Sequence, residues 1–291
     1  MLRFQGANSM KRETIGIVGQ GFVGTAVREG MKNYFNIAAY DKFKREASTC
    51  SSLKEVCRTA NVVFVCLPTP MKTNGSCDLS ILENVIYNIN EFEFKNIVVI
   101  KSTVVPGTTQ RLNRECRNID IVFSPEFLTE ANYIDDFKNQ NRIIIGGPRP
   151  ATTIVKNLFR KVFQKTPIVK TGSKTAESVK YFINCFLATK VSFANEFKQI
   201  CDISGVDYDK VVEYALYDER IGPTHLSTPG PDGHKGFGGS CFPKDLNALM
   251  YYANISGVST NVMKGVWDKN LEVRPQKDWE LLKGRAVSEE K

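Results

Sequence analysis

A cysteine in a glycine-rich setting is the first feature of the sequence that points to chemistry. Cys241 follows glycines at 236, 238 and 239 and precedes Lys244 and Asp245, where a helix is expected to begin. A helix N-terminus and a neighbouring cation both favour the thiolate, which is the nucleophilic form of cysteine. Taken alone, this segment fits a buried structural cysteine equally well.

A lysine and an amide form a second candidate pair. Lys180 and Asn184 are four residues apart, so they share one face of a helix. They lie beside an apolar stripe, where a lone lysine is unexpected. Two such side chains aimed at one point can stabilise a developing oxyanion. The alternative is a lysine whose stem lies along the stripe while its ammonium extends into solvent.

Further polar side chains follow the ends of expected strands, which is the edge where doubly wound sheets bind ligands. Glu126 and Glu130 come after one such strand and can supply a base, although they also suit a solvated surface. Thr103, preceded by Ser102, comes after another strand. A hydroxyl at this place can position a water molecule or cap the helix that follows.

A glycine motif predicts a dinucleotide site. Residues 19–24 read Gly-Gln-Gly-Phe-Val-Gly between a strand and a helix. In such a turn the first glycine allows the bend, the second lets backbone approach a pyrophosphate, and the third allows close helix–strand packing. A turn used only for packing is the alternative. The expected contacts are Gly19, Gly21, Phe22, Val23 and Gly24.

The end of the second expected strand indicates which dinucleotide binds. Asp41 ends that strand, and an acid there can bind both ribose hydroxyls and repel a 2′-phosphate. This favours NAD over NADP, although Lys42, which follows directly, leaves NADP open. We therefore expect NAD as the cofactor.

The elements expected around these residues predict an α/β fold that is followed by a helical second part. Short apolar runs typical of buried parallel strands lie at 14–18, 37–41, 62–67, 97–100, 119–123, 142–145 and 167–169. They alternate with helical stretches, which predicts a Rossmann-like doubly wound sheet. Residues 176–201 contain neither Gly nor Pro, and their apolar steps of three and four predict one long helix. Further helices are expected at 208–217, 244–254 and 262–273, with a Gly/Pro-rich loop at 222–239.

This pattern predicts the domain organisation. Residues 1–9 look like the remnant of a cleavable tag, residues 10–172 form the expected NAD-binding domain, and residues 173–291 form an all-α central domain.

Composition narrows the classes of partner and compartment. The net charge of +8, from 39 Lys+Arg against 31 Asp+Glu, is spread along the chain and suits an anionic small ligand better than nucleic acid. Eight cysteines without C-x-x-C spacing and two histidines predict no metal site. The thiols suggest a reducing cytoplasm. No apolar run approaches the roughly 18 residues of a membrane span.

Taken in order, several segments resemble the nucleotide-sugar dehydrogenase family, and within it the enzymes that oxidise UDP-glucose. They lie at 19–24, 66–70, 78–80, 102–108, 124–130, 220–222 and 239–245, and at Lys180 with Asn184. The segment around the cysteine reads Gly-Ser-Cys-Phe-Pro-Lys-Asp, as in the glucose enzymes. Members that act on N-acetylhexosamine nucleotides usually carry a Gly-His-Cys-Ile-Pro-Val-Asp-like segment instead.

The resemblance implies a four-electron oxidation of a sugar C6 alcohol to a carboxylate, with two NAD. Cys241 would capture the aldehyde as a thiohemiacetal, which a second oxidation converts to a thioester. Lys180 would stabilise the oxyanion, with Asn184 beside it.

Hydrolysis of the thioester would involve a different set of residues. By the same resemblance, Asp245 and Thr103 would position the water molecule. Glu126 or Glu130 would serve as base or polar support, with Glu126 the preferred candidate for hydrolysis.

The resemblance also implies binding residues and a partner. The cofactor site would include Pro68, Thr69, Thr103 and Glu130. The substrate site would be lined by Glu126, Phe127, Leu128, Lys180, Asn184, Phe237, Gly238 and Gly239, with Phe237 near the uridine. Arg220 would reach the sugar nucleotide of a neighbouring subunit, which implies a homodimer joined through the long-helix region. UDP-glucose is the expected substrate, without nucleic-acid or membrane partners.

Two other functions stay open, as does the extent of the chain. A β-hydroxyacid-type dehydrogenase pairs similar domains but oxidises once and needs no cysteine, and a non-catalytic NAD- or nucleotide-binding module has no use for the thiol. The family normally continues into a further domain that holds the uridine diphosphate, whereas this sequence stops at Lys291. The polar stretch 279–291 favours a natural end, and a chain cut before its last domain is the alternative.

Overall fold

The computed structural model describes residues 12–289. The stretch 1–9, which the sequence predicts to be a tag remnant, lies outside the described residues. Packing divides the chain into two compact units. The first comprises the chain up to Leu67 with Glu83–Ser102 and Thr109–Ala176, and the second comprises Pro68–Leu82, Thr103–Thr108 and the chain from Glu177 on.

A seven-stranded sheet forms the centre of the first unit, in the order β2-β1-β3-β4-β5-β6-β7. The strands are β1 (Thr14–Val18), β2 (Asn36–Tyr40), β3 (Val62–Val65), β4 (Ile97–Ile100), β5 (Asp120–Phe123), β6 (Ile143–Gly146) and β7 (Ile168–Thr171). The strand order changes direction between β1 and β3, as in Rossmann-like domains. The doubly wound fold is thus confirmed.

One strand pair departs from the expected parallel sheet. β5 and β6 are antiparallel, with Phe123 opposite Gly146, whereas the other pairs are parallel. An apolar run indicates that a strand is buried on both faces, but it carries no information about the direction of the strand, which explains the difference.

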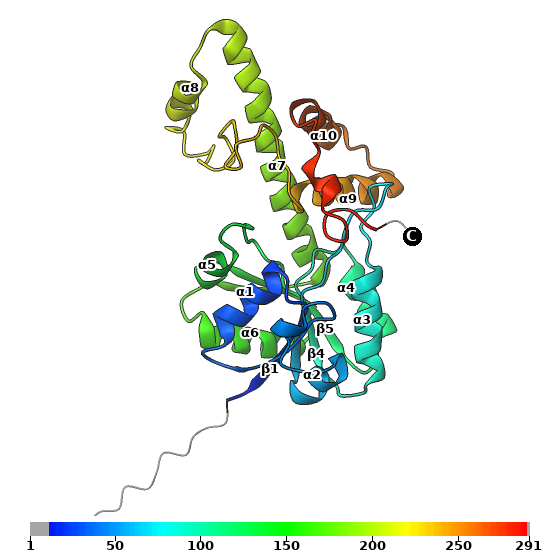
Figure 1. The fold of residues 1–291 in the computed structure, drawn as a ribbon. Coiled ribbons are helices and arrows are strands. Elements are labelled where there is room, and N and C mark those ends of the chain that lie inside the picture. The colour runs from blue at the N-terminus through cyan, green and yellow to red at the C-terminus, as the bar shows by residue number, and fades with distance from the viewer. Residues whose placement is uncertain (1–11, 290–291) are drawn as a thin grey trace, which may run out of the picture. The chain divides into compact units, whose positions relative to one another are not determined.

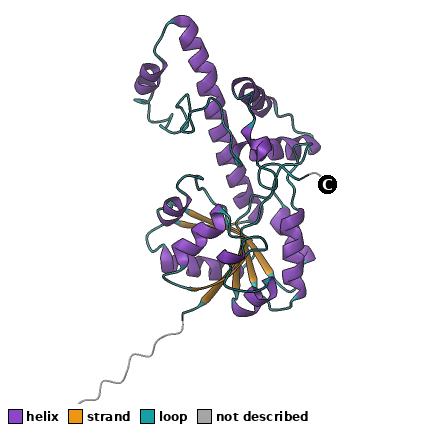
Figure 2. Cartoon of the chain, viewed as in Figure 1, coloured by secondary structure: helices purple, strands orange, loops and turns teal. Residues whose placement is uncertain are grey.

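Helices cover the sheet of the first unit (Figures 1 and 2). They are α1 (Phe22–Met31), α2 (Leu53–Thr59), α3 (Ser80–Glu91), α4 (Thr108–Glu115), α5 (Tyr133–Lys138) and α6 (Ala151–Val162), with a short 3₁₀ turn, η1 (Arg45–Ala47). Side chains of β1, β3 and β4 pack with those of α1, α5 and α6 in one buried cluster that includes Ile17, Phe64, Phe137 and Phe159. This packing fixes the strand ends from which the cofactor residues project.

The second unit is built on helices. They are α7 (Ser173–Ser204), which begins in the first unit, α8 (Tyr208–Ala215), α9 (Phe242–Ile255) and α10 (Asn261–Val273), with the 3₁₀ turn η2 (Asp278–Leu281). These bounds confirm the four expected helices. Tyr181, Phe237 and Leu246 pack in a core that joins α7, α9 and α10, and Cys77 and Val105 of the two inserted segments pack against it.

The pattern of burial along α7 does not follow the apolar stripe of its sequence. Lys180, Asn184 and their neighbours on that face are buried, whereas Phe182 is 71% exposed and Phe186 is 56% exposed. Part of the apolar stripe that defines the helix in the sequence is therefore uncovered within this chain. On the covered face, Tyr181, Cys185 and Ala188 pack with Leu246 and Ala248 of α9.

Candidate active site

The glycine turn after β1 has the shape that a dinucleotide requires. Gly19 has a φ of +90°, and a Cβ there would lie 2.3 Å from the Cys66 carbonyl oxygen. A Cβ on Gly24 would lie 1.9 Å from the Gly19 carbonyl oxygen, so this glycine lets α1 approach the turn. Gly21 is exposed, and no atom lies within 4 Å of its Cβ position. The open backbone at the N-terminus of α1, where Phe22 and Val23 begin the helix, therefore fits a pyrophosphate.

Asp41, directly after β2, is fastened to this turn. Its carboxylate accepts hydrogen bonds from the backbone N–H groups of Gln20 at 2.7 Å, Phe43 at 2.8 Å and Lys44 at 2.9 Å. Burial raises the pKa of Asp41, but these hydrogen bonds outweigh it and the pKa is lowered. The Lys42 ammonium lies 5.6 Å from the centre of the Phe43 ring. An ionised carboxylate is thus held where the ribose of NAD would lie in a Rossmann-like domain.

Cys241 is the N-cap residue of α9 in the second unit. Pro243 stands in the first turn of the helix, where its missing N–H removes no hydrogen bond. The Asp245 N–H donates to the Cys241 carbonyl oxygen at 2.9 Å, which closes the first helical turn. The cysteine is partly buried, with its sulfur 3.9 Å from the Ser240 hydroxyl oxygen. The thiol therefore lies at the positive end of the helix dipole.

A buried polar cluster surrounds the start of α9. Asp245 is 1% exposed, accepts a hydrogen bond from the Asn184 amide at 2.6 Å, and forms an ion pair with Lys244. Burial lowers the pKa of Lys244, but the charges of Asp245 and the Cys241 sulfur outweigh it and raise that pKa. Because attraction between charges is mutual, the ammonium also favours the Cys241 thiolate.

The inserted segments add two threonines and a cysteine to this cluster. The Thr69 hydroxyl donates to the Thr103 carbonyl oxygen at 2.8 Å, and the Cys77 sulfur lies 3.9 Å from the same oxygen. Burial is the main cause that raises the pKa of Cys77 to about 11, while the nearby Lys244 ammonium lowers it. Thr69 and Thr103 thus lie beside Cys77, and the role of Thr103 in positioning a water molecule stays a prediction.

Lys180 lies one turn before Asn184 on the covered face of α7. It is 3% exposed, so its side chain does not extend along the stripe into solvent. Tyr181, its neighbour, is 1% exposed, and its hydroxyl has no hydrogen-bond partner within residues 12–289. Burial raises the pKa of Tyr181. The role of Lys180 at the Cys241 sulfur stays a prediction.

Glu126 lines a cavity of about 280 Å³ in the first unit. Its carboxylate accepts a hydrogen bond from the Leu128 N–H at 2.8 Å, and Phe127 and Leu128 line the same cavity. Lys101, also in this lining, donates to the Pro125 carbonyl oxygen at 3.0 Å. Glu130 is exposed. Their predicted catalytic and cofactor roles stay predictions.

The remaining expected contacts differ in their surroundings. Pro68 is exposed. The Arg220 side chain is 89% exposed and pairs with Asp218. Phe237 is 4% exposed, and its ring contacts those of Phe242 and Trp267 in the core of the second unit. The observed partners of Phe237 are thus protein rings, and its contact with a uridine stays a prediction.

Some members of the site are not evident from the sequence. Neighbouring residues in a helix do not face each other, so no spacing rule predicts the Lys244–Asp245 ion pair. Cys77 and Tyr181 give no motif signal, because their place beside Asp245 depends on packing between distant segments.

A dinucleotide-type turn on a Rossmann-like sheet, followed by a helical unit, is the arrangement of an NAD-binding α/β protein. Residues 36–166 match the NAD binding domain of the UDP-glucose/GDP-mannose dehydrogenase family, and residues 174–272 match its central domain. The chain therefore belongs to this family.

Known relatives agree with this assignment. UDP-glucose 6-dehydrogenase AglM of Haloferax volcanii is 34% identical over 77% of this chain and 55% of the relative. UDP-glucose 6-dehydrogenase TuaD of Bacillus subtilis is 34% identical over 79% of this chain and 52% of the relative. A solved UDP-glucose dehydrogenase from Pyrobaculum islandicum superposes with a TM-score of 0.84 at 27% identity, covering 96% of this chain and 72% of that one.

The chain spans about half the length of the curated relatives it matches. Among the helices of residues 12–289, none combines the length and the apolar character needed to cross a bilayer.

Proposed function

We propose that this chain carries out the NAD-dependent oxidation of the C6 alcohol of a nucleotide sugar, UDP-glucose, to the carboxylate of UDP-glucuronate. The observation that carries the proposal is the buried cluster at the start of α9, where Asn184 and Lys244 meet Asp245 beside Cys241. A protein that only binds NAD or a nucleotide has no need of a thiol in this setting. An enzyme that oxidises a hydroxyacid in a single step has no need of the thiol either.

Cys241 explains how one site performs two oxidations. The glycine turn at residues 19–24 would hold NAD, which would supply a hydride acceptor for each oxidation. The first oxidation removes the hydroxyl proton and yields an aldehyde, to whose carbon the Cys241 thiolate then adds. The carbonyl oxygen becomes an oxyanion, which Lys180 and Asn184 stabilise and which takes up a proton. Loss of that proton and of a hydride gives the thioester.

Water completes the reaction. Asp245 and Thr103 position the water molecule, and Glu126 accepts its proton as the oxygen attacks the thioester carbon. The carbon–sulfur bond breaks and Cys241 returns as the thiolate, while the acid gives its second proton to solvent and leaves as the carboxylate. A covalent intermediate suits this sequence because a free aldehyde could escape or hydrate before the second oxidation.

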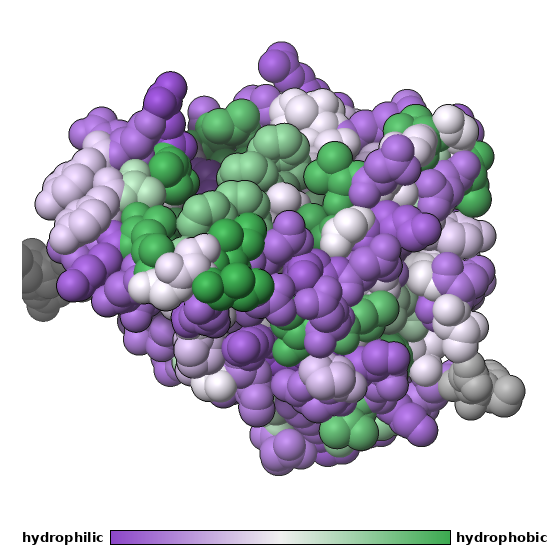
Figure 3. Space-filling model, turned by 90° about the horizontal axis from the view of Figure 1, so that it is seen from above, coloured by the Kyte–Doolittle hydropathy of each residue, from purple (hydrophilic) through white to green (hydrophobic). Residues whose placement is uncertain are grey.

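We also propose a cytoplasmic homodimer joined through α7. Phe182, Phe186, Phe193 and Ile200 lie on one uncovered face of this helix, with exposed fractions of 71%, 56%, 63% and 52%. Apolar residues also interrupt the hydrophilic surface seen in Figure 3. An exposed row of large apolar side chains of this kind is typical of protein interfaces. All eight cysteines lie within residues 12–289 and none forms a disulfide, which supports a reducing compartment.

Product stoichiometry tests the activity. With UDP-glucose and NAD we expect two NADH for each acid formed, measured by absorbance and by anion-exchange chromatography. One NADH per product would favour the hydroxyacid-type reaction, and NAD binding without turnover of any sugar nucleotide would favour a binding module. Cys241→Ser is expected to stop acid formation, so unchanged acid production by this variant would remove the cysteine from the mechanism.

A further inference from the structure

The segment that leads into Cys241 has little regular structure of its own. Residues 217–241 between α8 and α9 form turns and bends, and the glycines at 236 and 239 adopt φ values of +70° and +67°. A loop of this kind keeps one conformation only where other parts of the chain bind its backbone. Its fastening therefore determines where the cysteine lies.

Asn270 of α10 binds this loop at two points. Its side-chain oxygen accepts a hydrogen bond from the Phe237 N–H at 2.7 Å, and its amide donates to the Phe237 carbonyl oxygen at 3.0 Å. Asn270 is 0% exposed, so water cannot replace these bonds. Asn195 of α7 adds a third anchor, because its side-chain oxygen accepts from the Gly236 N–H at 3.2 Å.

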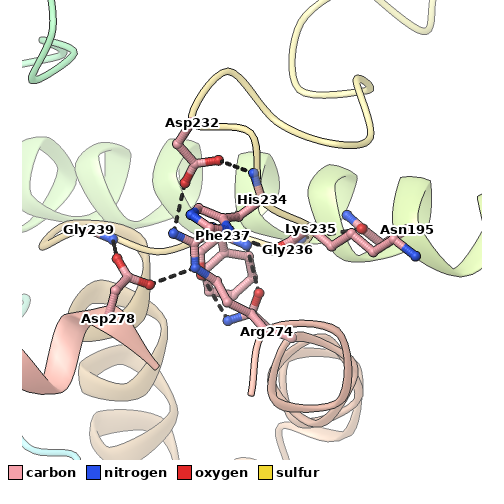
Figure 4. Close-up of polar contacts among 10 residues, drawn as sticks. Asn195, Asp232, His234, Lys235, Gly236, Phe237, Gly239, Arg274 and Asp278 are labelled. Carbon is pink, nitrogen blue, oxygen red and sulfur yellow. Dashed lines mark hydrogen bonds and ion pairs between the residues drawn. The ribbon is translucent and has the colours of Figure 1, made fainter. Parts of the chain in front are cut away.

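Arg274, the C-cap residue of α10, joins a carboxylate of the same loop to one in η2 (Figure 4). Its guanidinium is 3% exposed and donates to Asp232 at 2.7 Å and to Asp278 at 2.6 Å. Asp278 in turn accepts a hydrogen bond from the Gly239 N–H at 2.9 Å. Burial raises the pKa of Asp278, but the hydrogen bonds from Arg274 and Gly239 outweigh it and lower that pKa.

These anchors end close to the cysteine. Only Ser240 stands between Gly239 and Cys241. Peptide planarity leaves only two rotatable backbone angles per residue, so an anchor at the Gly239 N–H limits the positions that the Cys241 backbone can take. The chemistry described above uses none of the α10 side chains.

We propose that Asn270 and Arg274, the latter through Asp278, are positioning residues that present the Cys241 sulfur at the start of α9. The inference rests on the proposed function for the role of Cys241 in catalysis, but the placement of the thiol can be measured without turnover. Without these anchors the loop samples several conformations, and the sulfur no longer stays beside the Lys244 ammonium and the helix N-terminus that favour the thiolate.

Alkylation of the full chain by iodoacetamide at a series of pH values measures this placement. Mass spectrometry of peptides gives the rate at Cys241, while Cys57 and Cys185, which are 2% and 6% exposed, report any unfolding. The variants are Asn270→Ala and the milder Asp278→Ala, whose parent side chain is 34% exposed. Asn113→Ala is a matched control, because Asn113 binds both the N–H and the carbonyl oxygen of Ile121, at 2.9 and 2.7 Å, in the first unit.

We expect the midpoint of the pH–rate profile at Cys241 to rise by about one pH unit in both variants, with Cys57 and Cys185 unlabelled. Asn113→Ala should leave it unchanged. A midpoint at the wild-type value in Asp278→Ala would overturn the proposal, and so would an equal shift in Asn113→Ala. If Cys57 and Cys185 become alkylated in Asn270→Ala, that variant has unfolded, and the test of the proposal rests on Asp278→Ala alone.

Turnover separates the two proposals. If the midpoint shifts as expected but the wild-type chain does not oxidise UDP-glucose, the positioning role stands and the proposed function fails. If the wild-type chain turns over, the variants should lose acid formation in parallel with the shift, because the thiohemiacetal step depends on the thiolate. Loss of acid with an unshifted midpoint would overturn the positioning role alone.

Discussion

Replacement of Lys244 by methionine tests the electrostatics at the start of α9. The Lys244 side chain is 13% exposed and that of its ion-pair partner Asp245 is 2% exposed. Methionine preserves most of the volume but removes the ammonium that pairs with Asp245, which keeps the Asn184 amide at 2.6 Å. Loss of one partner from a buried ion pair costs about 3–5 kcal/mol. We expect a loss of this size in the free energy of unfolding of the second unit.

The chain offers a specific probe for this measurement. Both tryptophans, Trp267 and Trp279, belong to the second unit, so their fluorescence during urea denaturation reports the unfolding of that unit. The double variant Lys244→Met/Asp245→Leu removes both charges and should recover most of the loss, because a well-packed apolar pair often replaces a buried ion pair at little cost. The double variant should not form acid, because it lacks the Asp245 carboxylate that is proposed to position the water molecule.

The dependence on pH provides a second check on the same pair. The pKa of Lys244 is raised in the folded chain, because the neighbouring negative groups outweigh the effect of burial. A raised pKa contributes stability that is complete below the unfolded value of about 10.4 and is lost as pH rises through the folded value. The difference between wild type and Lys244→Met should therefore be constant from about pH 6 to 9. A loss below about 1 kcal/mol, as for exposed ion pairs, would refute a buried pair.

Three further predictions follow from the glycine turn, Asp41 and α7. Gly24→Ala should destabilise the first unit by about 1–3 kcal/mol or more, because its Cβ would lie 1.9 Å from a carbonyl oxygen. Gly21→Ala should leave the melting temperature unchanged, because its Cβ position is open, but should weaken NAD binding measured by calorimetry. Asp41→Ala should reduce the preference for NAD over NADP by roughly tenfold, and an unchanged ratio of the two dissociation constants would remove its role at the ribose. Phe186→Glu should shift light scattering from dimer to monomer, while a monomeric wild type would contradict the proposed α7 interface.

Local patterns predict the elements and the cofactor turn because their causes are local. The apolar runs, the glycine spacing at 19–24 and the helical steps of 176–201 depend on neighbouring residues, and the corresponding elements occur in the structure. The direction of β6 depends on the path of the chain between strands and is therefore not evident. The Asn270 contact with Phe237 joins residues 33 apart, and the Arg274 contact with Asp232 joins residues 42 apart, so no sequence pattern indicates either.

Several of the other cysteines lie in surroundings that disfavour the thiolate. Burial raises the pKa of Cys57 and of Cys66 to about 12 and is the main cause that raises that of Cys77 to about 11, so these thiols are protonated at neutral pH. Cys241 differs in two physical respects. It occupies the N-cap position of α9, and it lies beside the buried Lys244 ammonium, whose pKa the charge of the Cys241 sulfur helps to raise. Both favour the thiolate, and a reaction that must add sulfur to an aldehyde needs the thiolate. The glycine-rich loop alone would present any cysteine equally well, so the proposed role of Cys241 as a nucleophile rests on the polar cluster around Asp245.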